Sequence, residues 1–98
     1  MKFEDLERYL DILATKDIDP VKSLEEKELL YFIQKSVKEL RPVDKKVITS
    51  RYWKKQALRD IADRLGRSTE EVVFIEARAI NKLGDKIKAF IRDNGYII

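Results

Sequence analysis

Basic side chains and one serine gather between positions 51 and 82, in a pattern that suits phosphate binding. Arg and Lys pair with phosphate oxygens, and a Ser hydroxyl at a helix start can bind a phosphate together with the exposed amides there. The candidate phosphate contacts are Arg51, Lys54, Lys55, Arg59, Arg67, Ser68, Arg78 and Lys82. If about five of them neutralised DNA phosphates, log affinity would fall with log salt concentration with a slope of roughly −4.5. A solvated basic surface is the ordinary alternative for each cation.

Residues of a different chemistry follow directly, at Thr69, Glu70, Val73 and Phe74. Helical periodicity turns Glu70, Val73 and Phe74 outward, so this face is acidic and apolar. Val73 or Phe74 can touch thymine methyl groups in a major groove, with base discrimination of ~1 to 3 kcal/mol for the best pair. The alternative is a protein-binding surface, because adjacent exposed apolar side chains favour burial against a partner.

The composition argues against an enzyme. The chain has no Cys and no His, which removes thiolate chemistry, imidazole catalysis and nearly all zinc and haem sites. The neighbouring carboxylates of Glu70 and Glu71 point about 100° apart on a helix and cannot share a substrate. We therefore predict no catalytic residues, no cofactor and no metal.

The elements that position these residues form a predicted helix-turn-helix over Leu58–Leu83. Ile61, Ala62 and Leu65 form the apolar face of a short first helix, and Gly66 can take the positive φ of a tight turn. The second helix begins near Thr69, because Ser68 and Glu71 have the spacing of a capping box. Its predicted inner stripe is Val72, Ile75, Ala79 and Leu83. An ordinary helical hairpin with a C-capping glycine is the alternative.

Three further helices are predicted before the hairpin, over Phe3–Ala14, from a capping box at Ser23 to about Leu40, and from Val43 to about Trp53. The middle helix has a wide apolar stripe and is predicted to be central; its apolar residues are Leu24, Leu29, Leu30, Phe32, Ile33, Val37 and Leu40. We expect residues 1–19 to form an N-terminal helix and connector and residues 20–98 to form the hairpin-containing domain, with the two packed as one structural unit. The fold class is all-α, with five or six helices.

The last predicted helix has two open points. It continues beyond Leu83 through Ile87 and Phe90, with Gly84 either kinking or only weakening it, and Asn94-Gly95 is a good stop. The apolar residues 96–98 either fold back on the core or contact a partner.

Charge is unevenly distributed along the chain. Residues 1–40 carry 7 Lys/Arg and 10 Asp/Glu, whereas residues 41–98 carry 14 and 8. This asymmetry favours a polyanion partner for the second half. With no membrane-length apolar run and no signal peptide pattern, we expect a cytoplasmic protein.

The stretch from Leu40 to Leu83 resembles the fourth conserved region of bacterial sigma factors. The matching residues are Leu40-Arg41-Pro42, Asp44 to Ile48, Arg51-Tyr52, Asp60-Ile61-Ala62, Leu65 to Ser68, Val72, Ile75 to Ala79 and Lys82-Leu83. The resemblance implies a transcription regulator that binds promoter-type double-stranded DNA through the helix starting at Thr69. It also implies contact with RNA polymerase, because the family docks on the flap of the polymerase β subunit. Since 98 residues leave no room for the domain that melts promoter DNA, the resemblance implies a lone region 4 module: a partner of a separate sigma factor, a phage or mobile-element regulator, or a fragment.

One departure from the family stands out. The early positions of its second helix are usually rich in Arg and Gln, whereas here they are Thr69, Glu71, Val73 and Phe74. Glu70 lies where the family also has a glutamate able to accept a hydrogen bond from a cytosine amino group. The alternative function is therefore a protein-interaction module with a sigma-like fold, which binds RNA polymerase, a sigma factor or a second copy through Val73 and Phe74.

Overall fold

A computed structural model describes residues 3–15 and 24–94 of the chain. These residues form five α-helices and one π-helical turn, and no strand is present among them. The helices are α1 (Phe3–Thr15), α2 (Leu24–Lys38), α3 (Pro42–Ile48), α4 (Leu58–Leu65) and α5 (Thr69–Asn94), and the π-helical turn η1 (Thr49–Trp53) follows α3. The all-α prediction is confirmed. None of the described helices has the length and apolar character needed to cross a membrane.

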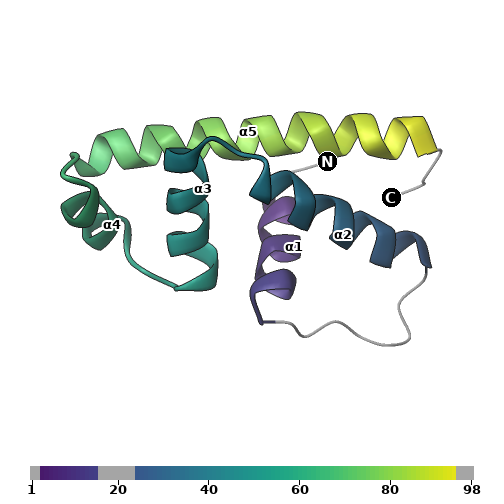
Figure 1. The fold of residues 1–98 in the computed structure, drawn as a ribbon, viewed down its shortest axis with the longest axis horizontal. Helices are drawn as coiled ribbons and strands as arrows, with labels where there is room; N and C mark the ends of the chain where they lie inside the picture. Colours follow the sequence, from purple (N-terminus) through teal and green to yellow (C-terminus); the bar gives the residue numbers. More distant parts are fainter. Residues whose placement is uncertain (1–2, 16–23, 95–98) are drawn as a thin grey trace.

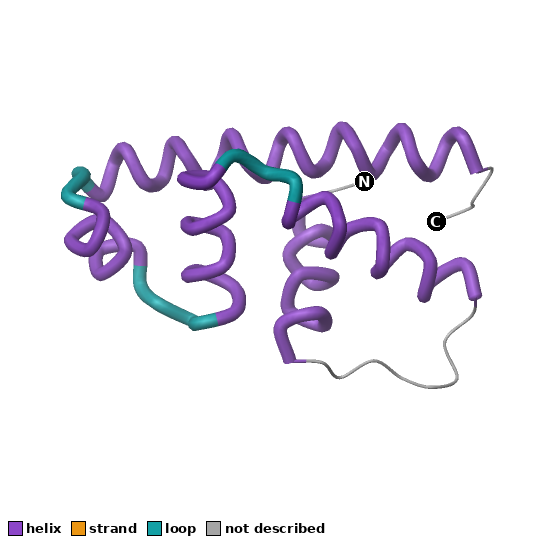
Figure 2. Tube along the Cα trace, viewed as in Figure 1, coloured by secondary structure: helices purple, strands orange, loops and turns teal. Residues whose placement is uncertain are grey.

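The long helix α5 organises the arrangement of the others. Its 26 residues extend about 39 Å at 1.5 Å per residue, close to the molecule's longest dimension of 41 Å. Figure 1 shows α3 and α4 beneath the first half of α5, and α1 and α2 beneath its second half. Loops connect α2 to α3, η1 to α4, and α4 to α5 (Figure 2). Helix α5 therefore runs from one end of the molecule to the other.

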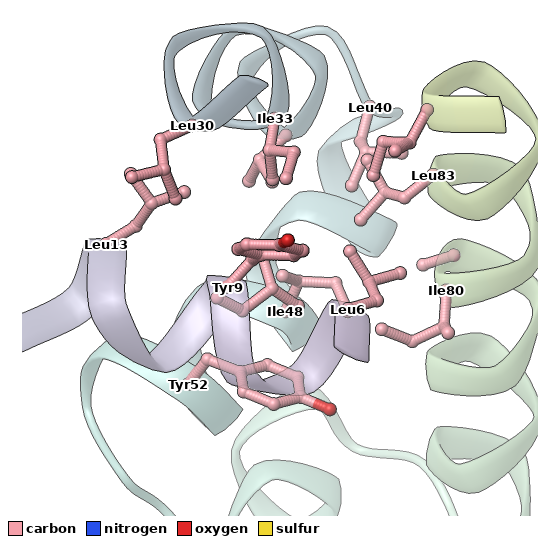
Figure 3. Close-up of a cluster of buried hydrophobic side chains, with 14 of the residues drawn as sticks. Leu6, Tyr9, Leu13, Leu30, Ile33, Leu40, Ile48, Tyr52, Ile80 and Leu83 are labelled. Atoms are coloured by element: carbon pink, nitrogen blue, oxygen red, sulfur yellow. The ribbon is translucent and has the colours of Figure 1, made fainter. Parts of the chain in front are cut away.

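The larger hydrophobic cluster lies beneath the second half of α5. Helix α1 contributes Leu6 and Leu10, α2 contributes Leu30 and Ile33, and α5 contributes Leu83, all with 2% or less of their surface exposed. Figure 3 shows these helices directing side chains into one shared interior, with Tyr9 and Tyr52 at its centre and edge. From Leu29 onward α2 buries its apolar stripe in this cluster, although α5, and not α2, runs beside both clusters.

The smaller hydrophobic cluster lies inside the predicted hairpin. It joins Val47 of α3, Ile61 and Ala62 of α4, and Val72 and Ile75 of α5. Ala62 is 2% exposed, and its small side chain permits the close approach of α4 to α5. The two helices of the hairpin therefore bury each other, as the apolar spacing predicts.

Two local predictions need correction. Leu24 was placed in the apolar stripe of α2, but it is exposed, because the buried part of that helix begins only at Leu29. The third helix reaches Trp53 as predicted, but it is α-helical only to Ile48 and then widens into a π-helical turn, where Lys54 N–H donates to the Thr49 carbonyl at 3.1 Å. Gly84, by contrast, does not break α5.

Several predictions fall outside the described residues. They are the helix start at Ser23 with its capping box, the stop at Gly95 and the placement of residues 96–98.

Candidate nucleic-acid interface

The turn between α4 and α5 depends on one glycine. Gly66 has φ 66° and ψ 33°, the left-handed conformation that costs an L side chain roughly 1–2 kcal/mol. Arg67 N–H donates to the Ala62 carbonyl at 3.0 Å, and Gly66 N–H donates to the Asp63 carbonyl at 3.3 Å. These bonds satisfy carbonyls at the end of α4 and fix the direction in which α5 begins.

The start of α5 is held by the predicted capping box. Glu71 N–H donates to Ser68 Oγ at 3.1 Å, while Ser68 N–H and Ser68 Oγ donate to Glu71 Oε1 at 3.4 and 3.2 Å. The Ser68 hydroxyl is thus already hydrogen-bonded, and a phosphate at this point would compete with the Glu71 carboxylate.

The hairpin exposes one face of α5. Phe74 and Val73 are 66% and 47% exposed, and Glu70, Ala77 and Asn81 are exposed beside them. Glu70, Phe74, Ala77 and Asn81 recur at i, i+4, i+7 and i+11, which forms one stripe along a helix. Thr69 is exposed at its beginning. This stripe is the surface that a helix-turn-helix offers to a groove.

Arg78 is tied to a buried acid in α3. Its Nη2 donates to Asp44 Oδ1 at 2.6 Å, and the Asp44 side chain is fully buried. The second oxygen of Asp44 lies 3.9 Å from Arg41 Nε and has no hydrogen-bond partner among the described residues. Arg78 therefore serves to neutralise a buried carboxylate, and its predicted phosphate contact would have to compete with that pair.

Arg51 is held in a second group at the junction of α1, η1 and α5. Its Nε lies 3.6 Å from Glu76 Oε2, and Tyr52 Oη donates to Glu7 Oε1 at 3.2 Å. Burial raises the pKa of Glu76, Arg51 opposes that rise, and Glu7 adds to it. Burial also raises the pKa of Tyr52, which stays protonated at neutral pH, and both carboxylates raise it further.

Two more candidate cations form ion pairs at the surface. Lys55 Nζ lies 2.6 Å from Asp11 Oδ1 of α1, and Arg67 Nη1 lies 3.5 Å from Glu71 Oε2. Each partner in these pairs is about half exposed, so water can replace either contact at little cost. In the described part of the chain, the remaining candidates Lys54, Arg59 and Lys82 are in no ion pair, and all three are exposed.

A hollow opens beside the exposed stripe. It has a volume of about 510 Å³ and lies between the start of α3, the α4–α5 turn and the first turns of α5. Val43, Phe74 and Ile75 supply its apolar lining, and its charged lining has both signs, from Arg67, Arg78, Glu70 and Glu71.

Sequence reasoning missed the acidic partners Asp11, Asp44 and Glu76. The burial of Asp44 was predictable, because it precedes Val47 and Ile48 by three and four residues and so shares their inward face. An acid at such a position needs a cation from another helix, which here is Arg78. The exposed position of Asp11 gave no comparable indication.

Comparison with known proteins agrees with this architecture. The family model for sigma-70, region 4, matches residues 37–84, from the end of α2 to the middle of α5. No curated protein and no solved structure matches the chain at a significant level. The family is one of helix-turn-helix domains that bind DNA in transcription. The match contains α3, the π-helical turn and the whole hairpin, and residues 37–84 are therefore a sigma-70 region 4 domain.

Proposed function

We propose that the protein regulates transcription by placing the first half of α5 in the major groove of promoter-type double-stranded DNA. The observation that carries this proposal is the exposed stripe of Glu70, Phe74 and Ala77 on the second helix of a packed helix-turn-helix. In such motifs the amino-terminal residues of the second helix contact base edges. Glu70 then accepts a hydrogen bond from a cytosine amino group.

The cations around the hairpin provide the phosphate contacts. Lys54, Arg59 and Lys82 are available without breaking an internal ion pair among the described residues. If only these three cations contact phosphates, the slope of log affinity against log salt concentration is about −2.7. Opening the surface pairs of Lys55 and Arg67 adds two contacts and brings the slope to about −4.5. The salt dependence thus reports which internal pairs open on binding.

The test is fluorescence anisotropy with labelled duplexes of different sequence over a series of salt concentrations. We expect Arg59→Ala to weaken binding to all sequences alike, because a phosphate contact carries no sequence information. Glu70→Ala is expected to change which sequence is preferred. Absent or salt-independent binding to every duplex would contradict the proposal.

A second function is favoured by the exposure of Phe74 beside the 510 Å³ hollow. A protein partner would cover both, and region 4 makes RNA polymerase or a sigma factor a reasonable one, with a second copy as the further option. A pull-down from the native cell with wild type and Phe74→Asp separates these partners. Loss of one protein from the Phe74→Asp sample, with DNA binding retained, would favour this second function.

A further inference from the structure

The exposed stripe of α5 lacks the side chain that most often reads guanine. Arg and Lys recognise guanine through its O6 and N7 acceptors. Between Thr69 and Asn81 the one basic residue is Arg78. Its guanidinium donates to the buried Asp44 at 2.6 Å and neutralises that charge. Direct guanine reading by this part of α5 would therefore leave a buried carboxylate without its partner.

The side chains on the first turns of the stripe suit pyrimidines, whereas Asn81, a residue type that reads adenine, lies seven residues or about 10 Å beyond Phe74. A carboxylate accepts from the cytosine amino group, and apolar side chains contact the thymine methyl group. Glu70 supplies the carboxylate, while Phe74 and Val73 supply exposed apolar surface one turn later. The methyl group is found on thymine alone, and the amino group of cytosine has no acceptor such as N7 beside it that would call for a donor side chain.

The spacing of these groups also fits one strand. Glu70 and Phe74 are four residues apart, which is about 6 Å along a helix axis. Successive bases of one strand are about 3.4 Å apart along the duplex. The two side chains therefore address bases about two steps apart when the helix lies along the groove.

From these observations we propose that α5 reads a pyrimidine-rich strand, and that Phe74, assisted by Val73, determines specificity by contacting thymine methyl groups. This inference rests on the proposed DNA-binding function and names the class of sequence that it recognises. None of the side chains of Glu70, Val73, Phe74 and Ala77 can donate a hydrogen bond, so none can bind the acceptor atoms of a purine on the same strand.

The test compares two duplexes that differ only in methyl groups. One has alternating thymine and cytosine on one strand, and the other has uracil in place of every thymine. Wild type is expected to bind the thymine duplex more tightly, by about fourfold for each methyl group that Phe74 and Val73 bury. Phe74→Ala is expected to lose most of this preference.

A matched control comes from α2. Tyr31 is 70% exposed, as Phe74 is 66% exposed, but it lies outside the hairpin. Tyr31→Ala is expected to keep the wild-type preference for thymine over uracil. Both variants change exposed side chains, and an unchanged melting temperature confirms that each remains folded.

The outcomes separate this inference from the proposed function. Equal, salt-dependent affinity of wild type for both duplexes would overturn the pyrimidine reading while leaving DNA binding in place. Identical affinities of wild type and Phe74→Ala for every duplex would also overturn it. No binding to any duplex would overturn both proposals.

Discussion

The two ends of α5 belong to hydrophobic clusters of unequal size. Among the described residues, the cluster beneath its second half contains fifteen buried side chains, and the cluster inside the hairpin contains five. Val72 and Ile75 belong to the smaller cluster, and Leu83 and Ile87 to the larger. A five-residue cluster buries little apolar surface by itself. We infer that the hairpin is held in shape because α5 is anchored at its other end.

The largest effect is expected from Leu83→Ala, which tests this dependence directly. Leu83 is fully buried, and such a truncation costs about 2–5 kcal/mol of unfolding free energy. Hydrogen exchange should show lost protection in α1, α2 and also α4, because the anchor of the hairpin is weakened. Ile61→Ala in the smaller cluster should instead expose α4 first. If Leu83→Ala leaves α4 as protected as in wild type, the hairpin is independent of the larger cluster.

The next prediction concerns the ion pair of Arg78 and Asp44, which lies between the two clusters. Arg78 lies between Ile75 of the smaller cluster and Ala79 of the larger, and its partner Asp44 is fully buried. Arg78→Met should cost about 2–3 kcal/mol, less than the roughly 3–5 kcal/mol for breaking a fully buried pair, because the guanidinium is 37% exposed and partly screened by solvent. Urea unfolding measures this loss. An exposed cation, Lys82, provides the control, and an equal effect of Lys82→Met would contradict the assigned role.

A smaller effect confined to the hairpin is expected from Ser68→Ala. This variant removes the capping hydroxyl that accepts from Glu71 N–H, at a cost of about 1 kcal/mol. Ser68→Thr should restore most of the loss, because threonine retains the hydroxyl. Lost exchange protection should stay within α4 and the first turns of α5. Equal loss in α1 would mean that the two regions unfold only together.

The structure of the hairpin is better predicted from the sequence than the packing of the other helices. The hairpin was predictable because its signals are local: Gly66 is the one residue type that takes positive φ freely, and Ser68 and Glu71 are three residues apart. The stripe through Val72 and Ile75 has an unbroken helical period. Each of these features is decided within one turn of the chain.

The rest depends on how the helices pack, which no local pattern encodes. Leu24 has the right spacing for burial, but none of the described helices covers its side chain. Similarly, the partners of Arg51 and Arg78 lie 25 and 34 positions away, so their pairing depends on the packing of η1 and α3 against α5. For this reason the candidate cations were predictable as a group, but their internal ion pairs were not.

The group around Arg51, where α1, η1 and α5 meet, makes stability depend on pH. The pKa of Glu76 is raised in the folded protein, chiefly by burial, so the folded state binds its proton more tightly than the unfolded state. Its contribution to stability therefore falls as pH rises from below about 4.5 through the raised pKa. In Glu76→Gln this fall is absent, and the difference in unfolding free energy between variant and wild type should shift in favour of the variant with rising pH. Urea titrations at a series of pH values measure it, and a difference independent of pH would contradict the assignment.

The smallest effect on stability is expected where the larger region touches the rim of the hairpin. Asp11 of α1 pairs with Lys55 at 2.6 Å, and both side chains are more than half exposed. Asp11→Asn should change stability by less than about 1 kcal/mol.

DNA binding should respond more clearly than stability. In Asp11→Asn, Lys55 no longer has to leave an ion pair before it contacts a phosphate, so affinity should rise at low salt. If Lys55 reaches a phosphate only in the variant, the salt slope also steepens by about 0.9. The matched control is Glu39→Gln, which removes a comparable surface pair with Lys86, 3.6 Å long, in the second half of α5. Equal changes in both variants would show that only net charge matters, whereas a change confined to Asp11→Asn would mean that α1 restrains one of the hairpin's DNA contacts.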